Sequence, residues 1–185
     1  MSQLTVWRSA FYDATEYRDS VQRKSFADLN CSIAQCLDAV GEWWSLLIVR
    51  DAFLGVTRFD DFHARLGISR NILTRRLNRL VDNGILSRVP YQDHPPRSDY
   101  RLTDKGRDLW HVVTAMRQWG DQWAAPRGAP VMMKHTACGH LVEAVAACSH
   151  CGEPFGIDEI TAVPGPGASD GDFDRIRPPH VPSGP

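Results

Sequence analysis

The chain has 185 residues, of which 43% are hydrophobic and 23% are charged. These proportions are typical of a soluble globular protein, and the length suffices for one ordinary domain with a small appendage. No stretch approaches the ~18 consecutive apolar residues of a transmembrane helix, and no basic-then-apolar signal segment opens the sequence. We therefore expect a cytoplasmic protein.

The formal net charge of −1 hides two regions of opposite sign. Between residues 65 and 101, eight arginines accompany three aspartates. From residue 152 to residue 185, six acidic residues accompany two arginines. The charge of the whole chain is therefore uninformative, whereas the local excess of arginine predicts contact with a polyanion.

The first part of the chain predicts three short helices. Residues 1–30 are polar with scattered aromatic side chains, and we assign them only as an N-terminal arm. From Ser32 the apolar spacing becomes helical, and this first helix is predicted to end at Gly41. The following run, 43–54, is apolar on almost every side, which predicts a helix buried at the centre of the domain. A third short helix is predicted to end at Gly67.

A fourth helix and a hairpin come next. The helix is predicted over 69–82, because Ser69 is a favourable N-cap and an Asn-Gly pair follows the last turn. Strands are predicted over 86–91 and 98–102, since the segment 94–97 between them contains two prolines and cannot continue either strand. Helices followed by such a hairpin predict a winged helix-turn-helix fold, mainly α with a small β-hairpin wing.

A long helix and an irregular tail complete the predicted order. The helix is expected over 104–125, with an apolar stripe from Leu109 to Trp123 at near-heptad spacing. Ten of the last 25 residues are Pro or Gly, so a disordered tail is predicted over 161–185. The winged domain itself is assigned to residues 31–103.

The outer face of the fourth helix predicts a nucleic-acid interface. Its leucines share one side, which leaves arginine and asparagine on the other, the side chains that read guanine and adenine edges in a major groove. The helix start is placed to contact phosphate, and the wing tip to reach the DNA backbone or the minor groove. A merely solvated face would explain any one of these arginines. The predicted DNA-binding residues are Ser69, Arg70, Asn71, Thr74, Arg75, Asn78, Arg79 and Arg97.

Short motifs follow one another in a fixed order along residues 31–123: Cys31-Ser32-Ile33-Ala34; Val40-Gly41-Glu42-Trp43-Trp44-Ser45-Leu46-Leu47-Ile48-Val49-Arg50; Arg58-Phe59-Asp60-Asp61-Phe62; Leu66-Gly67-Ile68-Ser69; Leu73-Thr74-Arg75-Arg76-Leu77; Gly84-Ile85-Leu86; Tyr91 with Pro95-Pro96; and Tyr100-Arg101-Leu102-Thr103-Asp104-Lys105-Gly106. Together they resemble the HxlR family of bacterial transcription regulators. The resemblance implies a homodimeric DNA-binding repressor or activator that dimerises through the terminal helices, here 104–125. Many members have proline where this chain has Ser32.

The same resemblance implies a role for one cysteine. Some members of the family use the cysteine at the position of Cys31 to sense oxidants or electrophiles. Cys31 precedes a predicted helix N-terminus, and Arg23 and Lys24 lie nearby in the sequence, which would favour a reactive thiolate. A structural role for Cys31 is the simpler interpretation. Cys36 is predicted to be a small buried apolar residue.

A histidine and three cysteines near the C-terminus form two copies of one pattern. The pairs His135/Cys138 and Cys148/Cys151 are each separated by two residues and followed by glycine. Two such turns, here called knuckles, can close a tetrahedral Cys₃His zinc site. Five cysteines, an odd number, also favour metal binding in a reducing compartment over a disulfide framework. We predict a structural zinc ion in a zinc-ribbon-like module over 130–157.

Other interpretations of this module stay open. His140 or His150 could replace His135, although neither lies at the mirrored position. The module could also be a metal-free or vestigial hairpin. A catalytic zinc is disfavoured, because four protein ligands leave no coordination position for water. The linker between the knuckles is long enough for a small β-hairpin.

These observations predict a sequence-specific, homodimeric transcription regulator that binds double-stranded DNA. The recognition helix, about 69–82, would lie in the major groove, and the wing, about 92–98, on the backbone or in the minor groove. The alternative is a zinc-ribbon adaptor whose winged domain contacts proteins. An enzyme is not expected, because the sequence has no Gly-rich phosphate loop and no nucleophile elbow. A small molecule or an oxidant would supply the signal.

Overall fold

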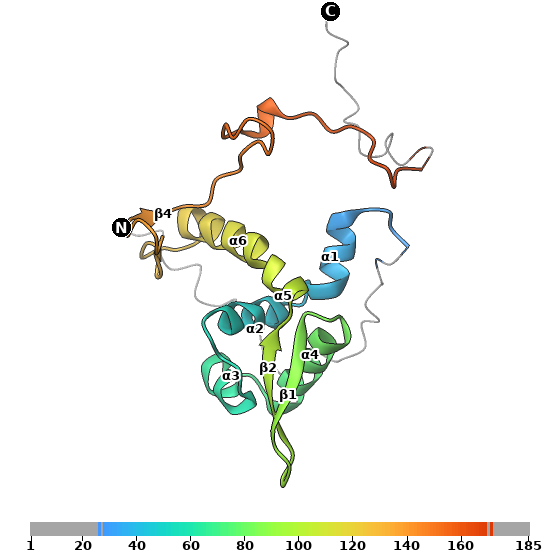
Figure 1. The fold of residues 1–185 in the computed structure, drawn as a ribbon, viewed down its shortest axis with the longest axis vertical. Helices are drawn as coiled ribbons and strands as arrows, with labels where there is room; N and C mark the ends of the chain where they lie inside the picture. Colours follow the sequence, from blue (N-terminus) through green and yellow to red (C-terminus); the bar gives the residue numbers. More distant parts are fainter. Residues whose placement is uncertain (1–25, 27, 170, 172–185) are drawn as a thin grey trace, which may run out of the picture.

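Helices and two antiparallel hairpins make up the computed structural model, which describes residue 26, residues 28–169 and residue 171. The elements are, in chain order, α1 (Ser32–Val40), α2 (Trp43–Phe53), α3 (Phe59–Leu66), α4 (Arg70–Asp82), β1 (Leu86–Gln92), β2 (Arg97–Leu102), α5 (Asp104–Asp108), α6 (Trp110–Trp123), β3 (Met133–Lys134), β4 (Leu141–Val142) and the 3₁₀ turn η1 (Ile157–Glu159). The predicted mainly helical fold with a small β-hairpin is confirmed (Figure 1).

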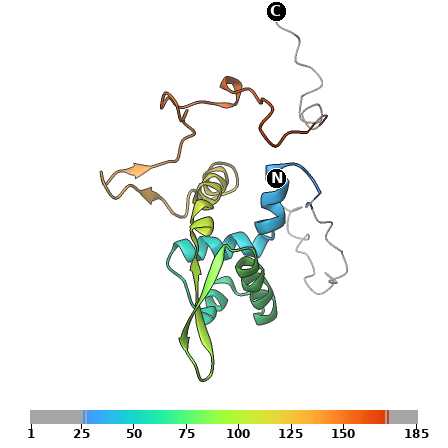
Figure 2. The same ribbon diagram turned by 45° about the vertical axis from the view of Figure 1, so that its right-hand side comes forward.

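The first hairpin forms a wing that extends away from the helices (Figures 1 and 2). Strands β1 and β2 pair antiparallel. The chain before α3 pairs with β2 as well, because the Tyr100 N–H donates to the Thr57 carbonyl at 2.8 Å and Arg58 forms a β-bridge with Asp99. This third pairing fixes the wing to the helical body, a contact that the sequence patterns did not reveal.

One continuous core holds α2, α3, α4 and the base of the wing together. Its most deeply buried apolar side chains are Ile48, Val49, Phe62, Leu73, Leu77, Leu80, Ile85 and Leu86. Burial of one such Leu, Ile or Phe side chain contributes about 1.5–3 kcal/mol to the free energy of folding. The leucines of α4 therefore fix that helix with one face inward and the opposite face outward.

Helix α2 is less enclosed than its apolar run predicts. Ser45, Ile48, Val49 and Asp51 are buried, but Trp43 is 85% exposed. The helix belongs to the core of the domain, as predicted, but Trp43 at its start is not covered. The packing partners, and not the composition of the run, decide which face of the helix is covered, and the first-turn tryptophan lies outside the chain's own core.

The long helix predicted over 104–125 is divided in two. Helix α5 ends at Asp108 and α6 begins at Trp110, with the buried Leu109 between them. Gly106 lies against the base of the wing, where a Cβ atom would be only 2.2 Å from the Ile85 carbonyl oxygen. Helical periodicity does not encode this close approach, which leaves no room for a side chain at position 106 of α5.

The two predicted terminal segments are described only in part. The N-terminal arm, 1–30, lies almost entirely outside the described residues, as does most of the predicted tail, 161–185. Residues 161–169 are exposed and form neither helix nor strand. Across the described ranges, no helix is both long and apolar enough to cross a membrane.

Candidate nucleic-acid interface

Helix α4 follows α3 across a short glycine turn. Gly67 has a φ of 65°, in the left-handed region that glycine adopts without strain, and its N–H donates to the His63 carbonyl at 3.0 Å. Ser69 then caps α4, and its hydroxyl oxygen accepts a hydrogen bond from the Ile72 N–H at 3.3 Å. The predicted turn and the predicted N-cap are both confirmed, and together the two helices form a helix-turn-helix.

The outward face of α4 is polar and cationic along its first half. Leu73, Leu77 and Leu80 are fully buried on the inner side. The exposed residues at the helix start and on its first two turns are Ser69, Arg70, Asn71, Thr74 and Arg75. These five side chains are all among the predicted DNA-binding residues, and they share the surface that faces away from the core.

Arg70 has an intramolecular partner at this surface. Its Nη2 lies 2.9 Å from Asp60 Oδ1 of α3, and both side chains are 63% exposed. The guanidinium also lies over the Phe59 ring, 5.5 Å from the ring centre. An ion pair this exposed contributes at most about 1 kcal/mol, so a phosphate oxygen can replace the carboxylate at little cost.

Arg79 faces the protein instead of the open surface. Its Nη2 donates to the Asp38 carbonyl at the end of α1 at 2.6 Å. The Asn83 side-chain amide donates to the adjacent Ala39 carbonyl at 2.9 Å. Both bonds satisfy carbonyls that the last turn of a helix leaves without partners, so Arg79 joins α4 to α1. Helical spacing alone placed Arg79 on the outer face and missed this contact.

Asn78 is also engaged within the chain. Arg88 of β1 donates to the Asn78 side-chain oxygen, and the same guanidinium lies over the Tyr100 ring at 5.6 Å from its centre. This bond orients the Asn78 amide, because the oxygen is occupied and the NH₂ group is left to donate elsewhere. The contact also joins the second half of α4 to the wing.

A cluster of charged and aromatic side chains supports the wing. Asp99 lies 3.1 Å from Arg101 and 3.9 Å from Arg58, and the Arg58 guanidinium stacks over the Tyr91 ring at 4.8 Å. Arg97 is exposed and begins β2 next to the tip. Because Arg58 comes from outside the hairpin, only the folded chain reveals its role in holding the wing.

Other arginines of the basic segment hold elements together. Arg76 lies 2.9 Å from Glu42 at the start of α2, and both side chains are about three-quarters buried. Arg65 lies 3.4 Å from the fully buried Asp51. The local excess of arginine in the sequence therefore overstates the charge that faces outward, since part of it is neutralised within the domain.

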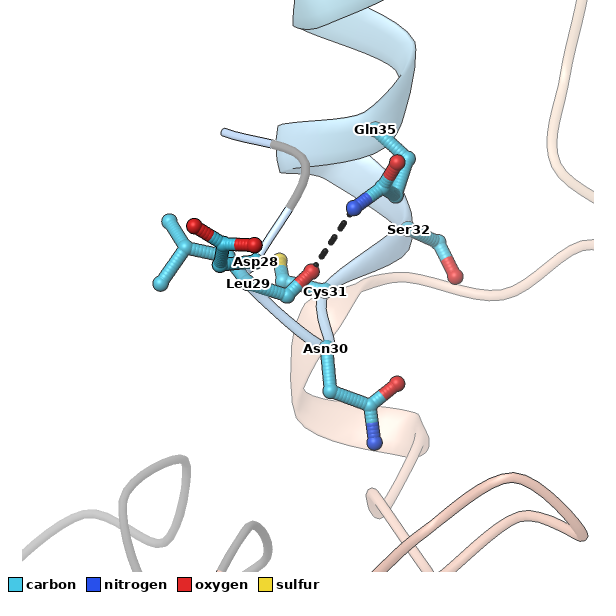
Figure 3. A pocket seen from close by; sticks show the side chains of 6 residues that line it. All are labelled: Asp28, Leu29, Asn30, Cys31, Ser32 and Gln35. Carbon is cyan, nitrogen blue, oxygen red and sulfur yellow. Dashed lines mark hydrogen bonds between the residues drawn. The ribbon is translucent and has the colours of Figure 1, made fainter. Parts of the chain in front are cut away.

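Cys31 lies at the N-cap of α1, where its side chain is exposed (Figure 3). Gln35, one turn into the helix, donates from its side-chain amide to the Leu29 carbonyl at 2.9 Å and holds the chain around the thiol. The shallow pocket at this point is lined by Asp28, Leu29, Asn30, Cys31, Ser32 and Gln35. Cys36 is half-buried and packs against the core, so it is less enclosed than predicted.

The two C-terminal knuckles adopt the same local structure. In the first, the Gly139 N–H donates to the His135 carbonyl at 2.8 Å, and in the second, the Gly152 N–H donates to the Cys148 carbonyl at 2.8 Å. Both glycines are left-handed, with φ values of 74° and 78°. His135 Nδ1 lies 3.2 Å from Cys138 Sγ.

The knuckles are each flanked by a short β-pairing. Strands β3 and β4 enclose the first, and a β-bridge between Ala147 and Pro154 encloses the second. The linker itself does not form the small hairpin for which its length would suffice, because these pairings flank the two knuckles instead.

Hydrogen bonds from the Cys151 and His150 amides and from the Cys151 side chain lower the pKa of the Cys148 thiol. Among the described residues, no three His, Cys, Asp or Glu side chains are grouped closely enough to hold one ion.

The helix-turn-helix, the wing beside it and the outward cationic face define a winged helix-turn-helix protein. A family model described as HxlR-like helix-turn-helix matches residues 39–127. An uncharacterized HTH-type transcriptional regulator of Mycobacterium tuberculosis, Rv3095, is 44% identical over 137 residues, which cover 74% of this chain and 87% of the relative. The chain therefore belongs to the HxlR-like helix-turn-helix family, as the motifs predicted.

Two solved structures share the fold. PA1607, described as a transcription factor, is 38% identical with a TM-score of 0.65, and the match covers 74% of this chain and 96% of that chain. PA1374 from Pseudomonas aeruginosa, described in the same way, is 42% identical with a TM-score of 0.58, covering 78% of this chain and 99% of that chain. The similarity therefore extends over most of both molecules.

Proposed function

We propose that this protein is a sequence-specific DNA-binding transcription regulator that acts as a homodimer. The observation that carries the proposal is the exposed strip of Ser69, Arg70, Asn71, Thr74 and Arg75 on a helix whose opposite face is fully buried. Family membership supports the same class, since the matched relatives are named transcriptional regulators. Helix α4 would enter the major groove, and the wing would reach the backbone or the minor groove.

The strip divides into two chemical roles. Ser69 and Arg70, at the N-terminus of α4, would contact phosphate together with the exposed amides of the first turn. Asn71 on the first turn, and Thr74 and Arg75 on the second, would read base edges. Arginine and asparagine each offer bidentate hydrogen bonds there, to guanine and adenine respectively.

Asn78, Arg79 and Arg97 take different parts in this proposal. Arg88 occupies the Asn78 oxygen, so the Asn78 NH₂ group would donate to a base acceptor or a phosphate. Arg79 would act by positioning α4 through its bond to the α1 terminus. Arg97, exposed beside the wing tip, would contact the backbone or the minor groove.

Dimerisation would use the side of the molecule away from the wing tip. Along α6, Val112, Met116, Trp119 and Trp123 are exposed at spacings of four, three and four residues, which places them on one face. Ile33 and Leu37 of α1 are exposed as well, and α1, like α6, lies away from the wing tip (Figure 2). Exposed apolar side chains along one helix face mark a protein interface, and a second copy of the chain would cover them.

The dimer is tested by the oligomeric state of the full chain in solution. Sedimentation analysis of the parent should give a dimer, whereas Trp119→Asp should give a monomer that retains the helical circular dichroism spectrum. Trp110 is the residue to compare with Trp119, because it packs edge-on against Phe53 of the same chain at 5.5 Å. A parent that sediments as a monomer at all concentrations would refute the homodimer.

The DNA-binding proposal is tested by selecting fragments from the source genome with purified protein. We expect a pseudo-palindromic site with half-sites about one helical turn apart, and an affinity that falls steeply with salt. Arg75→Ala should relax base preference at one position and weaken specific binding by about 1–3 kcal/mol. Arg127→Ala, an exposed arginine beyond α6, is the matched control and should change neither. Equal binding of all sequences by the parent would overturn the assignment.

The adaptor alternative is not favoured, because the family and the matched relatives point to DNA regulation. The same findings point to a regulator instead of an enzyme. An adaptor predicts that the parent binds all DNA sequences weakly and alike while forming a stable hetero-complex. The fragment selection therefore separates the two functions.

The regulatory signal, an oxidant or a small molecule, stays a prediction. For an oxidant, the exposed Cys31 is the candidate residue. The operator affinity of Cys31→Ser should stay constant in peroxide or a quinone, whereas that of the parent should change. Parallel responses of the two proteins would exclude Cys31 as the sensor, and Cys36→Ser provides the control for the other cysteine of α1.

A further inference from the structure

The C-terminal module has ordered turns without a hydrophobic core. Within residues 130–157, only Met133, Cys148 and Phe155 are half-buried, and every other side chain is exposed. Segments of this size cannot bury enough apolar surface to fold alone, and they usually need disulfides, a metal or a partner. The two repeated knuckles therefore require a cross-link that the chain's own packing does not supply.

The donor atoms of the first knuckle already have metal-site spacing. In a tetrahedral site with Zn–S of about 2.3 Å and Zn–N of about 2.0–2.1 Å, adjacent sulfur and nitrogen ligands lie roughly 3.5 Å apart. His135 Nδ1 and Cys138 Sγ are 3.2 Å apart, close to that edge. The second knuckle repeats the same backbone turn, with the same glycine hydrogen bond, around Cys148 and Cys151.

We propose that the two knuckles of one chain close on a single structural zinc ion held by His135, Cys138, Cys148 and Cys151. The ligand set is three soft thiolates and one imidazole, a combination that selects zinc and leaves no open position for catalysis. The ligands of the two knuckles are not grouped in the described part of the chain, so binding one ion would require the nine-residue linker, 139–147, to bring the second knuckle to the first. Zinc therefore supplies the folding energy of the module, and DNA recognition by α4 does not depend on it.

The other histidines are placed less well. His135 belongs to the same turn as Cys138, in the position that mirrors Cys148. His140 lies on the return side of the first hairpin, where its carbonyl accepts the His135 N–H at 2.9 Å. His150 lies between the two cysteines of the second knuckle. His140 and His150 thus provide matched control positions within the module.

The module is anchored to α6 at two points. The Gln118 side-chain amide donates to the Ala144 carbonyl, between the knuckles, at 3.0 Å. Arg117 reaches the Val131 carbonyl, before the first knuckle, at 3.4 Å. The zinc module would therefore be held beside the C-terminal half of α6, the helix to which we assign dimerisation (Figure 1).

Metal analysis of the full, tag-free chain with reduced thiols tests the proposal. We expect one zinc ion per chain, and on replacement with Co²⁺ the intense visible bands and the sulfur-to-metal charge-transfer band of a tetrahedral thiolate site. Cys148→Ser/Cys151→Ser should lose the metal, and His135→Ala should weaken its retention at least tenfold in a chelator titration. His140→Ala, His150→Ala and Cys36→Ser should bind metal like the parent.

Three outcomes would overturn the proposal. They are negligible zinc in the reduced parent, one zinc per two chains, and a loss of zinc in His140→Ala or His150→Ala that equals the loss in His135→Ala. Operator binding in excess chelator is measured on the same samples. That measurement separates a failure of the zinc site from a failure of the DNA-binding proposal, since the winged domain contains none of the four ligands.

Discussion

The winged domain and the C-terminal module reach ordered structure by different physical routes. The winged domain buries a continuous set of apolar side chains, with Leu73, Leu77 and Leu80 of α4 fully enclosed. The module, by contrast, leaves Leu141 and Val142 of β4 exposed and shows repeated turns around potential metal ligands. One region is held by hydrophobic burial and the other, we propose, by an ion.

This contrast predicts that the placement of α4 and the order of the module depend on different interactions. Burial in the winged domain fixes α4 rigidly, so that its outer face can be presented to DNA in one orientation. The module has little apolar surface to hide and depends on local turns, so its order should respond to metal availability without changing the reading helix. One pair of substitutions compares the two regions directly, and three further pairs compare positions within the winged domain and α6, from the largest expected effect to the smallest.

Leu77→Ala should produce the largest loss of stability. Removing a fully buried leucine leaves a cavity in the core and lowers the free energy of unfolding by about 2–5 kcal/mol. Leu141→Ala, at a leucine that is 61% exposed in the module, should change it by less than about 0.5 kcal/mol. Urea unfolding followed by circular dichroism measures both. Equal losses would mean that the module shares the core.

Gly106→Ala should destabilise the junction between the wing and the terminal helices. The added Cβ would meet the Ile85 carbonyl oxygen at 2.2 Å, and such overpacking costs about 1–3 kcal/mol. At Gly120 of α6 the surrounding described residues leave open space, so Gly120→Ala should stabilise the helix by up to about 1 kcal/mol. Opposite shifts of the thermal midpoint are therefore expected. Shifts of the same sign would contradict the close packing at Gly106.

Arg79→Ala and Arg75→Ala should separate stability from recognition. Loss of the charge-assisted bond from Arg79 to the Asp38 carbonyl should cost about 1.5–3 kcal/mol of unfolding free energy. Arg75→Ala should leave stability within about 0.5 kcal/mol of the parent and change base preference instead. Chemical denaturation and operator selection are measured on each variant. An Arg79→Ala protein of unchanged stability and altered base preference would restore Arg79 to the reading face.

Asp60→Asn should have the smallest effect and should act on DNA affinity. The Asp60 carboxylate pairs with the exposed Arg70 at the start of α4, and removing its charge should strengthen phosphate contact by about 0.2–1 kcal/mol for every sequence. The gain should shrink as salt rises, because exposed charges are screened. Titration of labelled operator and random DNA at two salt concentrations gives the result. Asp61→Asn, the neighbouring exposed acid, is the control.

Much of the fold could be predicted from local patterns. The N-cap at Ser69, the left-handed turn at Gly67 and the leucine spacing of α4 act within one or two helical turns, so the sequence displays them directly. The exposed strip from Ser69 to Arg75 could be predicted for the same reason. The roles of Asn78 and Arg79 could not, because their partners lie ten and 41 residues away along the chain.

Sequence alone therefore determined the order of the elements, the family and the two knuckle patterns, all of which depend on neighbouring residues. Only the tertiary structure decided which arginines face outward, that Trp43 is exposed at the start of α2, and that Gly106 lies against the Ile85 carbonyl at the base of the wing. The physical reason is common to these cases. A side chain of given type can hydrogen-bond, pack or face solvent, and the choice is made by distant groups that the folded core brings within reach.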